Sequence, residues 1–125
     1  MKAQAVTNKL SRILNRNNIF TNLNPTENRS LRVSNTIGVI KYDEIRQVID
    51  TLGKINYTFR VEHSESDYKT FFNLILQEKE GYSSVKLLKY VMTEEFAQLY
   101  NQNLKLDNFR GIVSSEVIVS DMPCN

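Results

Sequence analysis

Two stretches of alternating side chains, at residues 56–62 and 69–77, constrain the fold of this chain most. In the first stretch the apolar positions are Tyr57, Phe59 and Val61. Such alternation is typical of a strand with one buried face. The second stretch is rich in strand-forming residues and follows the turn-like residues 64–67 (SESD), so we expect it to be the partner strand, with a helix as the alternative. Its two faces would carry Thr70, Phe72, Leu74 and Leu76 on one side and Phe71, Asn73 and Ile75 on the other.

Apolar spacing and turn residues predict the remaining elements. These are a helix at 3–17, a strand at 30–34, a helix at 43–52, a helix at about 83–104 and a strand at 112–119. Residues 20–28 form a polar connection, and residues 35–40 extend the strand at 30–34 or pair with it. Thr93, which two glutamates follow, is an alternative starting point for a separate last helix.

The predicted order after the first helix is strand, helix, strand, strand, helix, strand. This is the ferredoxin-like βαββαβ arrangement. We therefore predict an α+β fold whose mainly antiparallel sheet has helices on one face and leaves the other face open. We expect one domain over residues 1–125, in which a basic amphipathic helix at 1–18 packs on an α+β core at 30–120, followed by a tail at 121–125.

Charge is divided unevenly along the chain. Residues 1–60 hold ten basic and four acidic side chains, a net charge of +6. Residues 61–125 hold six basic and ten acidic side chains, a net charge of −4. The first half can therefore attract polyanions, while the second half repels them.

The candidate binding residues are six cations and one aromatic ring. They are Lys9, Arg12, Arg16, Arg29, Arg32, Arg60 and Phe71. The first three form a stripe beside the apolar face of the first helix, and the sheet is expected to present the last three on its open face. Nucleic-acid backbones bind several such cations because neutralised phosphates release counterions, and a ring can stack a base. The alternative is a solvated charged rim around the apolar helix face.

Two segments resemble parts of the RNA-recognition-motif family. Residues 31–35 (LRVSN) are similar to its first strand, and residues 43–55 (DEIRQVIDTLGKI) are similar to its first helix and helix exit. The resemblance implies a sheet face that stacks RNA bases. Arg32 stands where the family has an aromatic ring, and Asn73 stands where it has a second one, so Phe71 is the stacking residue that remains.

The sequence offers no motif for catalysis, a metal or a cofactor, and we expect none of the three. His63 is the only histidine and Cys124 the only cysteine, so neither a nucleophile–base pair nor a cysteine-rich zinc site is available. Glu62 and His63 point to opposite faces of a strand, so we interpret His63 as a surface residue. The glycines are scattered, which excludes a glycine-rich phosphate loop.

The expected function is non-enzymatic binding of nucleic acid or a nucleoprotein complex. Two alternatives stay open: an inhibitor or adaptor of the viral or mobile-element type that binds a protein target, and a small-nucleotide binder. No apolar run approaches the roughly 20 residues that cross a bilayer, so we expect no membrane association. One cysteine and no signal peptide predict a cytoplasmic protein. Open sheet edges, including the last strand, would allow a homo-oligomer.

Overall fold

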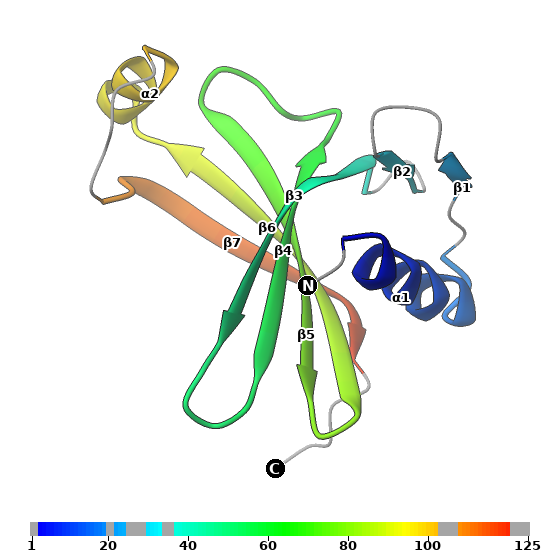
Figure 1. Ribbon diagram of the computed structural model, residues 1–125. Coiled ribbons are helices and arrows are strands. Elements are labelled where there is room, and N and C mark those ends of the chain that lie inside the picture. Colours follow the sequence, from blue (N-terminus) through cyan, green and yellow to red (C-terminus); the bar gives the residue numbers. More distant parts are fainter. Residues whose placement is uncertain (1–2, 20–21, 25–29, 34–36, 103–107, 121–125) are drawn as a thin grey trace.

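The computed structural model describes residues 3–19, 22–24, 30–33, 37–102 and 108–120. The described elements are α1 (Ala3–Arg16), β1 (Asn22–Asn24), β2 (Ser30–Arg32), β3 (Val39–Ile49), β4 (Ile55–Glu62), β5 (Thr70–Lys79), β6 (Tyr82–Met92), α2 (Glu94–Asn101) and β7 (Gly111–Ser120). The seven described strands form one sheet in the order β1 to β7, and each strand pairs antiparallel with the next in sequence (Figure 1).

This sheet order contradicts the predicted ferredoxin-like arrangement. The first reason is that the predicted helix at 43–52 is mostly strand β3. Its apolar residues fit helical spacing, but Val48 and Ile49 are 50% and 61% exposed, so they form no buried helix face. Both are β-branched, and Ile49 pairs with Ile55 across the β3–β4 hairpin. A strand at this place also removes the resemblance to the RNA-recognition motif, whose first helix would lie there.

A tight turn at residues 50–54 makes the β3–β4 hairpin. The Asp50 Oδ1 atom accepts hydrogen bonds from the backbone N–H groups of Leu52 (2.8 Å) and Lys54 (2.9 Å). The hydrogen bond from Lys54, followed by that from Leu52, lowers the pKa of Asp50. Gly53 takes a φ of 82°, a left-handed conformation that glycine adopts without a Cβ clash. The glycine that the sequence analysis took for a helix stop therefore closes a hairpin.

The second reason is that the predicted helix at 83–104 is divided into strand β6 and helix α2. Glu80 and Gly81 have φ values of 52° and 83° and join β5 to β6, as in a two-residue hairpin turn. After β6, the alternative start at Thr93 is confirmed. The Thr93 Oγ1 atom accepts a hydrogen bond from the Phe96 N–H (3.2 Å) and caps α2.

Several other predictions are confirmed. The helix at 3–17 is α1, and the strands at 30–34, 56–62, 69–77 and 112–119 are β2, β4, β5 and β7. Along β5 the side chains of Phe72, Leu74 and Leu76 are buried, as predicted, and those between them are half-buried. Residues 35–40 were predicted to pair with the strand at 30–34, and β3 does pair with β2. Strand β1 was not predicted, since it lies within the expected polar connection at 20–28.

The main core lies between α1 and one face of the sheet. Leu10 and Leu14 of α1 are fully buried in the same cluster as Phe59 of β4 and Leu74 of β5. Figure 1 shows α1 beside the sheet and α2 at a distant end, beyond β6 and β7. Neither described helix has the length and apolar character needed to span a membrane.

Candidate aromatic and arginine groove

The sheet face opposite α1 carries a groove with a volume of about 620 Å³. Its lining, which defines the groove below, is Ile45, Arg46, Thr58, Arg60, Phe71, Asn73, Tyr90 and Tyr100. Strand alternation creates this second face: Phe59 and Phe72 point to the core, so Arg60 and Phe71 point away from it. The volume falls in the range of roughly 300–1,000 Å³ that is usual for ligand sites.

Strand register brings the lining residues together in pairs. Arg46 lies opposite Thr58 in the β3–β4 pair, and Arg60 lies opposite Asn73 in the β4–β5 pair. Phe71 lies opposite Tyr90 in the β5–β6 pair. Directly opposite side chains in an antiparallel sheet are neighbours on the same face. The floor of the groove therefore joins two arginines, an amide and two rings across four strands.

Three aromatic rings form one wall of the groove. The ring centroids of Phe71 and Tyr90 lie 4.5 Å apart with planes 5° from parallel, and those of Phe71 and Tyr100 lie 5.9 Å apart at 4°. Phe109 meets Phe71 and Tyr90 edge-on, at 85° and 79°, and supports their orientation. The Tyr100 side chain is 47% exposed. The rings thus stack on one another, Phe71 also packs on the small core cluster of Met92, Phe96 and Ala97, and Tyr100 is the most exposed aromatic surface of the wall.

Helix α2 holds Tyr100 above the sheet. The Tyr68 hydroxyl donates a hydrogen bond to the Glu94 carboxylate (2.7 Å), which raises the pKa of Tyr68. The Asn101 side-chain amide donates to the backbone carbonyls of Tyr68 (2.6 Å) and Ala97 (2.7 Å). These contacts fasten both ends of the short helix to the β4–β5 loop, and so fix the position of Tyr100.

The two arginines give the groove its positive charge. Arg46 is exposed, and the Arg60 side chain is 62% exposed. An Arg60 Nη2 atom lies 4.0 Å from Asp43 Oδ2, at the outer limit of an ion pair. Exposed pairs of this kind contribute only about 0–1 kcal/mol, so Arg60 can still bind another anion. Guanidinium groups suit phosphate in particular because they donate two parallel hydrogen bonds.

The structure places two of the predicted binding residues, Arg60 and Phe71, in the groove. Lys9, Arg12 and Arg16 lie on α1, which covers the other sheet face. Arg12 and Arg16 are exposed there. The basic stripe of the helix and the groove therefore face different sides of the sheet.

Of the other predicted cations, only Lys9 has a side chain within the described part of the structure. The Lys9 ammonium donates a hydrogen bond to the Glu78 carboxylate of β5, so its charge is paired within the fold. Arg29 lies outside the described residues. Arg32 belongs to β2 by its backbone, and its side chain also lies outside the described part of the structure.

Sequence reasoning missed Arg46 and Tyr90 because it assigned both to helices. It missed Tyr100, which does lie in a helix, because the place of α2 beside the groove depends on where β6 ends. The turn-forming pair Glu80–Gly81 was the signal that could have corrected this, since an acidic residue followed by glycine between two apolar stretches is typical of hairpins. With β6 recognised as a strand, Tyr90 would fall opposite Phe71.

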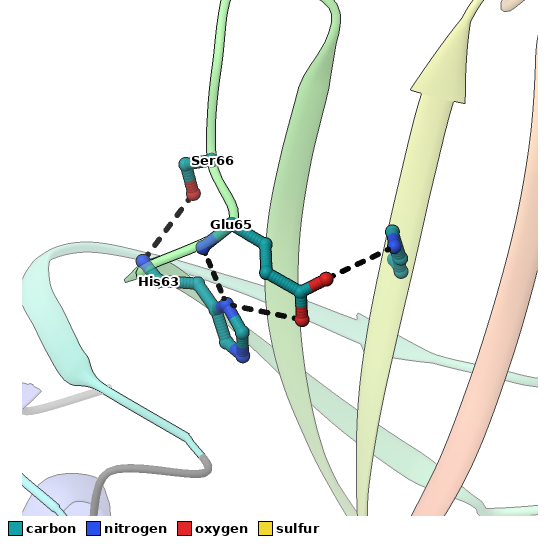
Figure 2. Close-up of polar contacts among 4 residues, drawn as sticks. His63, Glu65 and Ser66 are labelled. Carbon is teal, nitrogen blue, oxygen red and sulfur yellow. Dashed lines mark hydrogen bonds and ion pairs between the residues drawn. The ribbon is translucent and has the colours of Figure 1, made fainter.

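His63 is not the surface residue that the sequence suggested, because its side chain is only 8% exposed. Its ring stacks on Phe72 with centroids 3.9 Å apart, and its Nδ1 atom accepts a hydrogen bond from the Glu65 N–H (3.0 Å). The His63 N–H in turn donates to Ser66 Oγ (3.3 Å), as Figure 2 shows. His63 therefore organises the β4–β5 turn. Among the described residues, no group of three His, Cys, Asp or Glu side chains could hold a metal ion.

Comparisons with protein-family models, curated proteins and solved structures give no match to this chain. What the groove could bind can therefore be judged only from the chemistry of its lining.

Proposed function

We propose that this protein binds single-stranded nucleic acid in the groove, with bases on the aromatic wall and phosphates on the arginines. The observation that carries the proposal is the nearly parallel alignment of Phe71, Tyr90 and Tyr100 beside the exposed Arg46 and Arg60. Proteins that bind single strands combine these same two components, a cationic path for the backbone and rings for the bases.

The aromatic wall would supply much of the affinity. Stacking of a base on an aromatic side chain contributes about 1–3 kcal/mol and tolerates any base, since every base has a π-face. The Asn73 amide lies in the groove floor and offers both donors and an acceptor to a base edge. We therefore expect broad sequence tolerance with a modest base preference.

The open form of the groove favours a strand over a free nucleotide. Sites for small ligands commonly enclose about 70–90% of the ligand surface. Here Tyr100 and Arg60 at the border of the groove remain 47% and 62% exposed. Lys86 lies on the same sheet face, in the row that runs from Arg46 through Thr58 and Ile75. A nucleic-acid backbone that crosses these strands along the row would meet a cation at each end, Arg46 at one and Lys86 at the other.

A titration of fluorescently labelled oligothymidine and oligouridine against the purified chain tests this function. Arg46→Gln and Arg60→Gln should each weaken binding several-fold and reduce the slope of log affinity against log salt by roughly 1. Tyr100→Ala should weaken binding with little change in the salt slope, because it removes stacking and keeps the charges. Arg12→Gln on α1 is the matched control and should leave affinity and slope unchanged.

The alternatives give different outcomes in the same experiment. If Arg12→Gln weakens binding and the groove variants do not, the basic helix is the binding surface and the groove is not. If mononucleotides raise the melting temperature while oligonucleotides do not bind, the ligand is a small nucleotide. If wild type binds neither, the nucleic-acid function is wrong, and a protein target becomes the better hypothesis.

A further inference from the structure

Strand β7 forms one edge of the sheet. It pairs with β6, and no other strand in the described part of the chain lies along its second side. It spans ten residues, and its first seven are all exposed. A strand of this kind presents a row of free backbone donors and acceptors that can pair with another strand.

Apart from a bulge at Ile118, this edge lacks the usual protection against pairing. Glu116 is the only charged residue of β7, and the strand contains neither lysine nor proline. Three of its apolar side chains, Ile112, Val113 and Val117, are 71%, 48% and 57% exposed. The opposite edge is β1, which has only three residues. Short length protects β1, and among the described strands β3 beyond Lys41 pairs only with β4. In contrast, β7 is long, apolar and accessible along its first seven residues.

The sequence of β7 is nearly symmetric about Ser115. Reading outward from this residue in both directions gives Ser114 and Glu116, then two valines (113 and 117), then two isoleucines (112 and 118). Antiparallel strands pair residues in this mirrored order. A symmetric dimer requires a surface that is complementary to itself, and a strand with mirrored side chains meets that requirement.

We propose that two copies of this chain pair through their β7 strands, antiparallel, with Ser115 opposite the partner's Ser115. Val113 then lies opposite the partner's Val117, within the regular part of the strand that precedes the bulge at Ile118. The Ser114 hydroxyl can donate to the partner's Glu116 carboxylate, which avoids a buried unpaired charge.

Other symmetric registers are less favourable because of Glu116. A register centred on Ser114 would put this carboxylate opposite Ile112. A register centred on Glu116 would put two carboxylates directly opposite each other, which destabilises a strand pair. The register centred on Ser115 avoids both arrangements, because it pairs Val113 with Val117 and places Glu116 opposite Ser114.

This dimer would join the two sheets edge to edge. Because the two-fold axis of such a pair runs perpendicular to the sheet, both grooves would lie on the same side of the joined sheet. The pairing does not depend on the ligand of the groove, so it can be tested on the protein without nucleic acid.

Sedimentation equilibrium at high micromolar concentration tests the assembly. The wild-type chain should have twice its 14.5 kDa mass. Val113→Lys should shift the mass to that of the monomer, because it places a cation on the edge. Val48→Lys is the matched control, since Val48 is 50% exposed but lies on β3, away from β7, and it should leave the dimer intact. A monomeric wild type, or equal masses for the two variants, would overturn the proposal.

Cysteine cross-linking tests the register. In a background carrying Cys124→Ser, oxidation of Ser115→Cys should produce a covalent dimer, because the two thiols would lie opposite each other at a separation that a disulfide spans. Ser114→Cys should cross-link poorly, because its opposite residue is the partner's Glu116. Stronger cross-linking through position 114 than through position 115 would contradict the proposed register.

Discussion

The Lys9 ammonium on α1 donates to the Glu78 carboxylate on β5, and this ion pair fastens the helix to the sheet. The Lys9 side chain is 45% exposed and that of Glu78 only 18%, so the contact is partly shielded from water. A cation that the sequence suggested for ligand binding is thus engaged in holding the fold together.

Lys9→Gln is therefore expected to lower stability without changing oligonucleotide affinity. The loss in the free energy of unfolding should be about 0.5–1 kcal/mol, at the upper end for a partly exposed pair. Chemical denaturation of Lys9→Gln, Glu78→Gln and the double variant measures the coupling between the two side chains. A clear loss of affinity in Lys9→Gln with unchanged stability would instead show that Lys9 contacts the ligand.

Replacing an apolar residue of β3 should have little effect compared with replacing one of the core. Val48 is 50% exposed, whereas Phe59 is fully buried. Phe59→Ala should cost about 3–5 kcal/mol of unfolding free energy through lost packing and a cavity. Val48→Thr, which keeps the β-branched shape, should stay within about 0.5 kcal/mol of wild type. Large losses from Val48→Thr would contradict the strand assignment and favour a helix with Val48 on its buried face.

Removing the cap of α2 should disturb the groove from a distance. Thr93→Ala eliminates the hydrogen bond that Thr93 Oγ1 accepts from the Phe96 N–H, at a cost of about 1 kcal/mol. Because α2 carries Tyr100, we expect faster amide hydrogen exchange in the helix together with weaker oligonucleotide binding. Thr51→Ala, at an exposed turn position, is the control and should alter neither measurement. Unchanged affinity despite faster exchange would show that the position of Tyr100 does not matter for binding.

Acid should remove the contribution of Asp67 to stability. Its Oδ1 atom accepts a hydrogen bond from the Lys69 N–H (3.0 Å), which lowers the pKa of Asp67 below its ordinary value of 3.8. Since the folded-state pKa is the lower one, the stabilisation is complete above the unfolded-state pKa and disappears as the pH falls through the folded-state value. Asp67→Asn should therefore melt below wild type at neutral pH, and the two melting temperatures should converge as the pH falls through the folded-state pKa of Asp67. A constant difference across this range would exclude the carboxylate charge as the cause.

Local alternation was enough to predict β4 and β5 and the faces of their side chains, and it placed Arg60 and Phe71 on one face. It failed where a strand also satisfies helical spacing. Ile45, Val48 and Ile49 fit helical spacing but are also β-branched, and only the partner strand β4 decides between helix and strand. The position of Tyr90 depends on the pairing of β6 with β5, and that of Tyr100 depends on where α2 lies beside the sheet. Neither contact follows from the spacing of residues within one short stretch of sequence.

The strict alternation of β5 has a consequence for how this protein can evolve. Phe71 and Phe72 are neighbours in the sequence, yet Phe71 lines the groove and Phe72 is 3% exposed in the core. Substitutions at Phe71 and Asn73 can therefore change the lining of the groove, whereas those at the even positions from 70 to 76 disturb the core. A saturation library across 70–77 would lose folded variants mainly at the even positions.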